Sequence, residues 1–154
     1  MPLHPAWAKN ISRRVLWGAL ERDLSKDERA AMGKHFDLRC AYCGNELGAK
    51  WHADHLVSVD QGGVNHPSNR VPACPKCNEN EKREMDWLEY LKIKSGTTLQ
   101  LFDERRNRIE QWMTSMRPQS PPVTEDQRAE WKRQIAIVAK AIDEAWATLK
   151  ALKK

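Results

Sequence analysis

The chain has 154 residues, of which 40% are hydrophobic and 31% charged, and this composition excludes an intrinsically disordered protein. No apolar run is long enough to span a membrane, and the first ten residues lack the apolar segment of a secretory signal, so we expect a cytoplasmic protein that contacts no membrane. The net charge of +5 favours a polyanionic partner, although many basic proteins bind no nucleic acid.

Two helices are predicted in the N-terminal part of the chain. Apolar residues at helical spacing predict the first helix over residues 5–24. The segment from Ser25 to Glu28 has the form of a capping box, which predicts a second helix from residue 26 to about 33. Gly33 is placed to end this second helix.

Two Cys-x-x-Cys pairs, thirty residues apart, contain all four cysteines of the chain. Four thiolates in two pairs complete the tetrahedron that zinc favours, so the sequence predicts a structural zinc site. An iron–sulfur or redox site is the alternative, and disulfides fit a reducing cytoplasm less well. The expected zinc ligands are Cys40, Cys43, Cys74 and Cys77.

The segment between and after the cysteine pairs is predicted to contain, in order, a strand, a loop, the metal-binding turn of the second cysteine pair and a helix. Alternation over residues 50–59 predicts the strand, and the glycine pair at 62–63 predicts a turn in the loop. Apolar spacing predicts a helix over residues 78–94. A further helix is expected from Thr98 to Met116.

The C-terminal part begins with a proline-rich linker at residues 117–123, in which the prolines forbid a continuous helix. A capping box from Thr124 to Gln127 then predicts a last helix. Its apolar residues recur at alternating spacings of four and three, which predicts a short heptad seam. The seam could form a homodimer, bind a protein partner or pack on the helix at 5–24, and its shortness favours intramolecular packing. The seam residues are Trp131, Ile135, Val138, Ile142, Ala145, Leu149 and Leu152.

The central segment, over roughly residues 38–90, resembles the HNH endonucleases of the ββα-metal fold. The resemblance is carried by six elements in the same order: the two cysteine pairs, Asp54-His55, Gly62-Gly63, Asn69 and Cys77-Asn78. It implies that His55 is the general base, that Asp54 and Asn78 bind a catalytic Mg²⁺ or Mn²⁺, and that Asn69 holds the loop that positions His55.

Three positions depart from the family pattern. Asn78 stands where many members have histidine, and Ser58 where a proline often follows the Asp-His pair. Lys82 lies one residue further from Asn78 than the lysine usually found in that helix, which leaves its role open. None of these departures removes a candidate catalytic group.

The residue chemistry agrees with these roles. A histidine such as His55 has an ordinary pKa near 6.5, so it can be neutral at pH 7 and accept the proton of an attacking water. Asp54 and Asn78 offer the oxygen ligands that a hard cation prefers.

We therefore expect an α+β protein with a zinc-stapled ββα-metal core at residues 35–94. A helical segment at 1–34 and a helical extension at 95–154 flank this core. The expected function is metal-dependent cleavage of DNA, with double-stranded DNA as substrate, in a protein of bacterial or phage origin. A non-catalytic zinc module that binds nucleic acid, or a nuclease that acts on RNA, are the alternatives.

Overall fold

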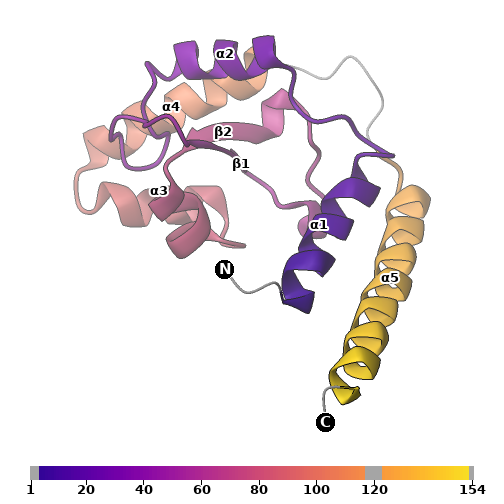
Figure 1. Cartoon of the computed structure of the whole chain (residues 1–154). Coiled ribbons are helices and arrows are strands. Elements are labelled where there is room, and N and C mark those ends of the chain that lie inside the picture. The colour runs from indigo at the N-terminus through magenta and orange to yellow at the C-terminus, as the bar shows by residue number, and fades with distance from the viewer. Residues whose placement is uncertain (1–3, 117–122, 153–154) are drawn as a thin grey trace. The chain divides into compact units, whose positions relative to one another are not determined.

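The computed structural model describes residues 4–116 and 123–152, and these form two units (Figure 1). Residues 1–22 and 122–154 make one unit, here called the hairpin unit, and residues 23–121 make the other, the core unit. The expected linker at 117–123 lies almost wholly outside the described residues. Helices combine with one small two-stranded sheet, which confirms the α+β class.

The hairpin unit consists of two helices, α1 (Pro5–Trp17) and α5 (Glu125–Ala151), that pack against each other. The predicted extension of the first helix to residue 24 was wrong. α1 ends with Gly18 as its C-cap, because glycine costs about 1 kcal/mol relative to alanine inside a helix.

The start of α5 follows the predicted capping box. The Thr124 hydroxyl accepts from the backbone N–H of Gln127 at 3.2 Å, and the Gln127 side chain accepts from the backbone N–H of Thr124 at 2.9 Å. Trp131, the first residue of the heptad seam, packs edge-on against Trp17 with ring centroids 4.9 Å apart. The seam therefore packs on α1 at its beginning, whereas Leu149 and other residues near its end are exposed.

In the core unit, α2 (Lys26–His35) begins at the predicted capping box of Ser25 and Glu28. Gly33 does not end this helix, contrary to the sequence expectation. It lies inside α2, at a position where a side chain would meet close neighbours. An added Cβ would sit 3.0 Å from the Leu38 side chain and 3.8 Å from that of Trp51.

Two short antiparallel strands form the sheet, β1 (His52–His55) and β2 (Arg70–Ala73). The strand predicted over residues 50–59 is thus reduced to four residues. Its register pairs His52 with Ala73 and His55 with Arg70. The loop between the strands contains two short 3₁₀ turns, η1 (Val59–Gln61) and η2 (Pro67–Asn69).

The helix predicted over residues 78–94 is divided in the structure. Its first part is a π-helical segment, η3 (Lys76–Lys82), and its second part is α3 (Trp87–Ser95). Arg83, whose φ is 48°, lies between these two parts and interrupts the helix. The next helix, α4 (Leu99–Ser115), follows close to its predicted range.

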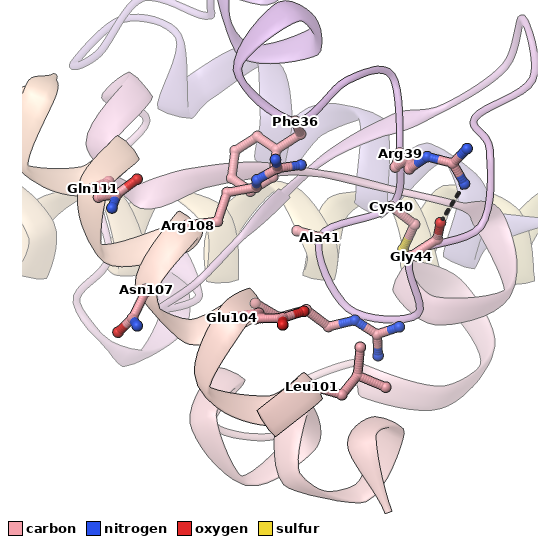
Figure 2. A pocket seen from close by; sticks show the side chains of 11 residues that line it. Phe36, Arg39, Cys40, Ala41, Gly44, Leu101, Glu104, Asn107, Arg108 and Gln111 are labelled. Carbon is pink, nitrogen blue, oxygen red and sulfur yellow. Dashed lines mark hydrogen bonds between the residues drawn. The ribbon is translucent and has the colours of Figure 1, made fainter. Parts of the chain in front are cut away.

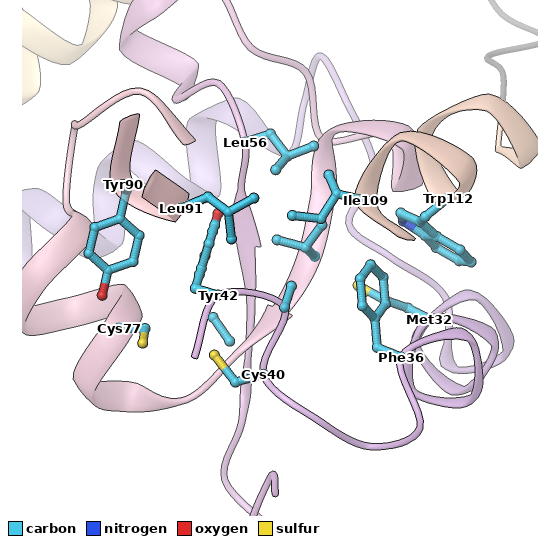
Figure 3. Packing of buried hydrophobic residues seen from close by; sticks show 13 residues of the cluster. Met32, Phe36, Cys40, Tyr42, Leu56, Cys77, Tyr90, Leu91, Ile109 and Trp112 are labelled. Atoms are coloured by element: carbon cyan, nitrogen blue, oxygen red, sulfur yellow. The ribbon is translucent and has the colours of Figure 1, made fainter. Parts of the chain in front are cut away.

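A single hydrophobic cluster joins α2, the sheet, α3 and α4 (Figure 3). Trp112 of α4 is almost fully buried, and its indole N–H lies 2.9 Å from the carbonyl oxygen of Pro67 and 2.8 Å from that of Arg70. α4 is therefore tied directly to the start of β2. The largest buried members are Trp112, Tyr42, Tyr90, Phe36, Met32, Leu56, Leu91 and Ile109. None of the described helices has the length and apolar character that a membrane span requires.

Candidate active site and metal centre

The four cysteines come together in one cluster. Their sulfur atoms all lie within 4.8 Å of one another, and the sulfurs of Cys43 and Cys74 are 3.9 Å apart. A zinc ion with Zn–S bonds of about 2.3 Å holds tetrahedral sulfurs roughly 3.8 Å apart, so the donor set fits zinc. In the cluster, hydrogen bonding with Cys43 raises the pKa of the Cys40 thiol to about 11, while the same contact lowers the pKa of Cys43.

The first cysteine pair is held by a tight turn and by α4. Gly44 follows the pair with a φ of 74°, in the left-handed region that glycine tolerates. The guanidinium of Arg105 donates to the carbonyl oxygens of Tyr42 and Cys43 at 2.8 and 2.9 Å. A cavity of about 480 Å³ lies between this turn and α4, and Arg39 at its rim donates to the Gly44 carbonyl (Figure 2).

A second cavity, of about 530 Å³, is lined by three of the four residues expected to be catalytic. Asp54 and His55 reach it from β1, and Asn78 reaches it from η3. The fourth, Asn69, is not among the residues that line this cavity. The remaining lining residues are Ser58, Glu79, Arg83 and Glu84.

The Asp54 carboxylate is buried and held at one oxygen. Its Oδ2 accepts a hydrogen bond from the Tyr42 hydroxyl at 2.7 Å and lies 3.2 Å from the Lys82 ammonium. Burial raises the pKa of Asp54, and the charge of Lys82 opposes that rise. Burial also raises the pKa of Tyr42 well above its ordinary value, so the phenol stays protonated and donates. Oδ1 of Asp54 hydrogen-bonds none of the described residues and is available to a ligand.

His55 stands at the end of β1, directly opposite Arg70 in the sheet. Its Nε2 lies 2.9 Å from the Asn65 side-chain oxygen and 3.0 Å from the Arg70 guanidinium. The pKa of His55 is lowered to about 4, first by burial and second by the positive charge of Arg70. The imidazole is therefore neutral at pH 7.

The Asn69 side chain closes the loop that follows His55. Its oxygen accepts from the backbone N–H of Val57 at 3.0 Å, and its amide nitrogen donates to the carbonyls of Val57 and Val64 at 2.8 and 2.9 Å. Gly63 belongs to the same closed loop. Both ends of the loop are thereby fixed beside β1.

The Asn78 amide is oriented by a neighbouring histidine. Its Nδ2 lies 2.8 Å from Nδ1 of His52, which shares a face of β1 with Asp54 because side chains alternate along a strand. With the nitrogen engaged in this contact, the amide oxygen of Asn78 is the atom left to bind a cation.

Sequence reasoning missed three contacts of the site. Arg70 and Asn65 carry no motif signal, and only the strand register and the loop path bring them to His55. Tyr42 lies inside the first cysteine pair, where its hydroxyl could have been noted as a donor but its target could not.

The core unit thus combines a small antiparallel sheet, a following helical segment and a four-cysteine cluster. Residues 40–84 match the family model described as HNH endonuclease, which confirms the resemblance over this segment. Over 107 residues the chain is 27% identical to YoqL, an SPbeta prophage-derived protein of Bacillus subtilis (strain 168) whose name places it among HNH endonucleases. That match covers 64% of the chain and 42% of YoqL, so the chain spans less than half of that relative. No solved structure matches the chain significantly.

Proposed function

We propose that this protein is a metal-dependent endonuclease that hydrolyses DNA phosphodiester bonds. The observation that carries the proposal is the single cavity lined by Asp54, His55 and Asn78. Catalysis is assigned to residues 35–94, with the helical segments at 1–34 and 95–154 in supporting roles.

The four-cysteine cluster is assigned to structural zinc. Four thiolates leave no open position on a tetrahedral ion, so this site is closed to substrate. Its contribution is to folding, because metal binding to a small domain adds directly to its stability.

The oxygen donors of Asp54 and Asn78 fit a hard divalent cation such as Mg²⁺ or Mn²⁺. Asp54 Oδ1 and the Asn78 amide oxygen each hydrogen-bond none of the described residues, and both residues line one cavity. When bound, the cation supplies charge stabilisation at the scissile phosphate and at the leaving oxygen.

The chain's own contribution to the reaction is a positioned base. His55 is neutral in the folded protein, so it can accept the proton of the attacking water without first losing one of its own. Asn69 fixes the loop that begins just after His55, and Arg70 and Asn65 hold the edge of the ring. General base catalysis of this kind typically contributes about 10²–10⁴-fold.

The substrate assignment to double-stranded DNA rests on the family resemblance and on the net charge of +5, which favours a polyanion. To test this assignment, zinc-loaded protein is incubated with supercoiled plasmid and with a structured RNA of similar length. Each substrate is tested with and without Mg²⁺. Mg²⁺-dependent nicking or linearisation of the plasmid, with the RNA left intact, is expected. Cleavage of the RNA alone would show that RNA, and not DNA, is the substrate. Cleavage of neither would contradict the proposal.

A further inference from the structure

Two donors from distant parts of the core unit meet at one oxygen of Asp54. The Tyr42 hydroxyl donates to Oδ2 at 2.7 Å, and the Lys82 ammonium lies 3.2 Å from the same atom. Asp54, Tyr42 and Lys82 are all buried, so solvent competes little for these contacts. The carboxylate is therefore fixed at one oxygen, while Asp54 lines the cavity and its other oxygen hydrogen-bonds none of the described residues.

Tyr42 is itself held in place by the first cysteine pair, of which it is the third residue. Its carbonyl accepts from Arg105, and its ring packs edge-on against Tyr90 with centroids 5.1 Å apart (Figure 3). The side chain is completely buried. The direction of its hydroxyl therefore depends on the fold of the cysteine pair.

Lys82 is fixed by the segment that carries the second cysteine pair. It is the last residue of η3, which also contains Cys77, and its ammonium donates to the carbonyl oxygen of His55 at 2.8 Å. The side chain is only 2% exposed, and a buried ammonium requires partners of this kind. Lys82 thus contacts the side chain of one expected catalytic residue and the backbone of the next.

Lys82 is buried at the end of a π-helical segment, η3. A π-helix bonds residue i to i+5, where an α-helix bonds i to i+4. Short π-helical segments are rare and are often found at functional sites. Arg83 follows with a φ of 48°, a backbone conformation that a bulky residue adopts only where its surroundings impose it.

We propose that Tyr42 and Lys82 are positioning residues that together fix the Asp54 carboxylate for the catalytic cation, so that the two cysteine pairs set the geometry of the active site. This inference rests on the proposed function, because it concerns the cation expected there. Partners that hydrogen-bond a metal ligand typically account for 10–100-fold in metal affinity or activity.

The test compares Tyr42→Phe and Lys82→Met with Tyr90→Phe in zinc-loaded protein. Tyr90→Phe is the control for loss of a phenol hydroxyl from the core: its hydroxyl donates to Glu81 at 2.6 Å and also contacts Cys77, and it does not touch Asp54. Each variant is first checked for zinc content and thermal midpoint. Mn²⁺ affinity is then measured by electron paramagnetic resonance, and kcat and KM are measured for plasmid cleavage.

Tyr42→Phe and Lys82→Met should each weaken Mn²⁺ binding and lower kcat by about 10–100-fold, with KM for DNA unchanged. Tyr90→Phe should change both quantities less than about twofold. The double variant should lose less than the product of the two single losses, because both residues act on one carboxylate.

Tyr42→Phe with wild-type Mn²⁺ affinity and kcat would overturn the inference while leaving the proposed function intact. Equal losses in Tyr42→Phe and Tyr90→Phe would also overturn it, since they would reflect general damage to the core. A wild-type protein that binds Mn²⁺ no better than Asp54→Asn and cleaves no DNA would instead refute the proposed function, and the positioning role with it.

Discussion

Replacing Gly63 by alanine should open the loop that holds His55. An added Cβ would lie 1.8 Å from the carbonyl oxygen of Val57 and 2.8 Å from the Asn69 amide nitrogen, distances that no side-chain atom can occupy. The obstruction at Val57 is backbone, so the loop itself has to move. Since the Asn69 side chain hydrogen-bonds both the N–H and the carbonyl of Val57, the movement breaks these contacts as well.

The magnitude follows from those contacts. Asn69 makes three hydrogen bonds across the loop, each worth a net of about 0.5–1.5 kcal/mol. Forcing an extra carbon into a packed site adds about 1–3 kcal/mol of strain. The free energy of unfolding should therefore fall by roughly 3–7 kcal/mol if the core unit unfolds cooperatively. It should fall by less if the loop opens locally.

Urea unfolding, zinc content and plasmid cleavage measure this effect, with Gly48→Ala as the matched control. A Cβ at Gly48 would meet no atom within 4 Å. Gly63→Ala should retain zinc, unfold at lower urea and cleave DNA at least about a hundredfold more slowly, the low end of a lost general base. If Gly63→Ala matched Gly48→Ala in both stability and cleavage, the closed loop would not be what positions His55.

Four further predictions test separate parts of the structure. Chelation of zinc should unfold the core unit, seen as loss of the far-ultraviolet circular dichroism signal, and a protein that stays folded without metal would contradict the structural role of the cysteines. Asp54→Ala and Asn78→Ala should abolish cleavage with zinc content unchanged, whereas wild-type rates at limiting Mg²⁺ would remove either residue from the cation site. DNA affinity should fall steeply between low and moderate salt, since bound phosphates release counterions, and a flat response would favour a protein partner. Because the lowered pKa of His55 leaves its imidazole neutral well below the ordinary value of 6.5, cleavage should persist through pH 6.5 and be lost only as pH falls toward about 4; a loss centred on 6.5 would contradict the burial of His55.

Local sequence signals predicted much of the fold. The capping boxes that begin at Ser25 and Thr124 depend only on residues three apart, and both form as expected. The cysteine spacing likewise predicted the cluster. Gly33 was misread because a glycine at a helix end and a glycine at a close contact look alike in sequence, and only the packing against Leu38 and Trp51 separates them.

The missing parts of the site depend on contacts between segments distant in the chain. β2 is a four-residue strand that contains Pro72, so periodicity gave no signal for it, and without its register Arg70 could not be placed opposite His55. Lys82 is buried at the end of a π-helical segment, which helix propensity does not distinguish from an α-helix. The residues of the family motif were therefore readable from sequence, while the groups that hold them were not.

The central claim is tested most directly by the cleavage rate of His55→Ala beside that of His4→Ala. His4 is an exposed histidine at the start of α1, so its removal controls for loss of an imidazole elsewhere in the chain. With saturating Mg²⁺ and full zinc content, His55→Ala should bind plasmid normally and cleave it at least about a hundredfold more slowly than His4→Ala. Equal rates for the two variants would show that His55 is not the base, and the proposed active site would be wrong.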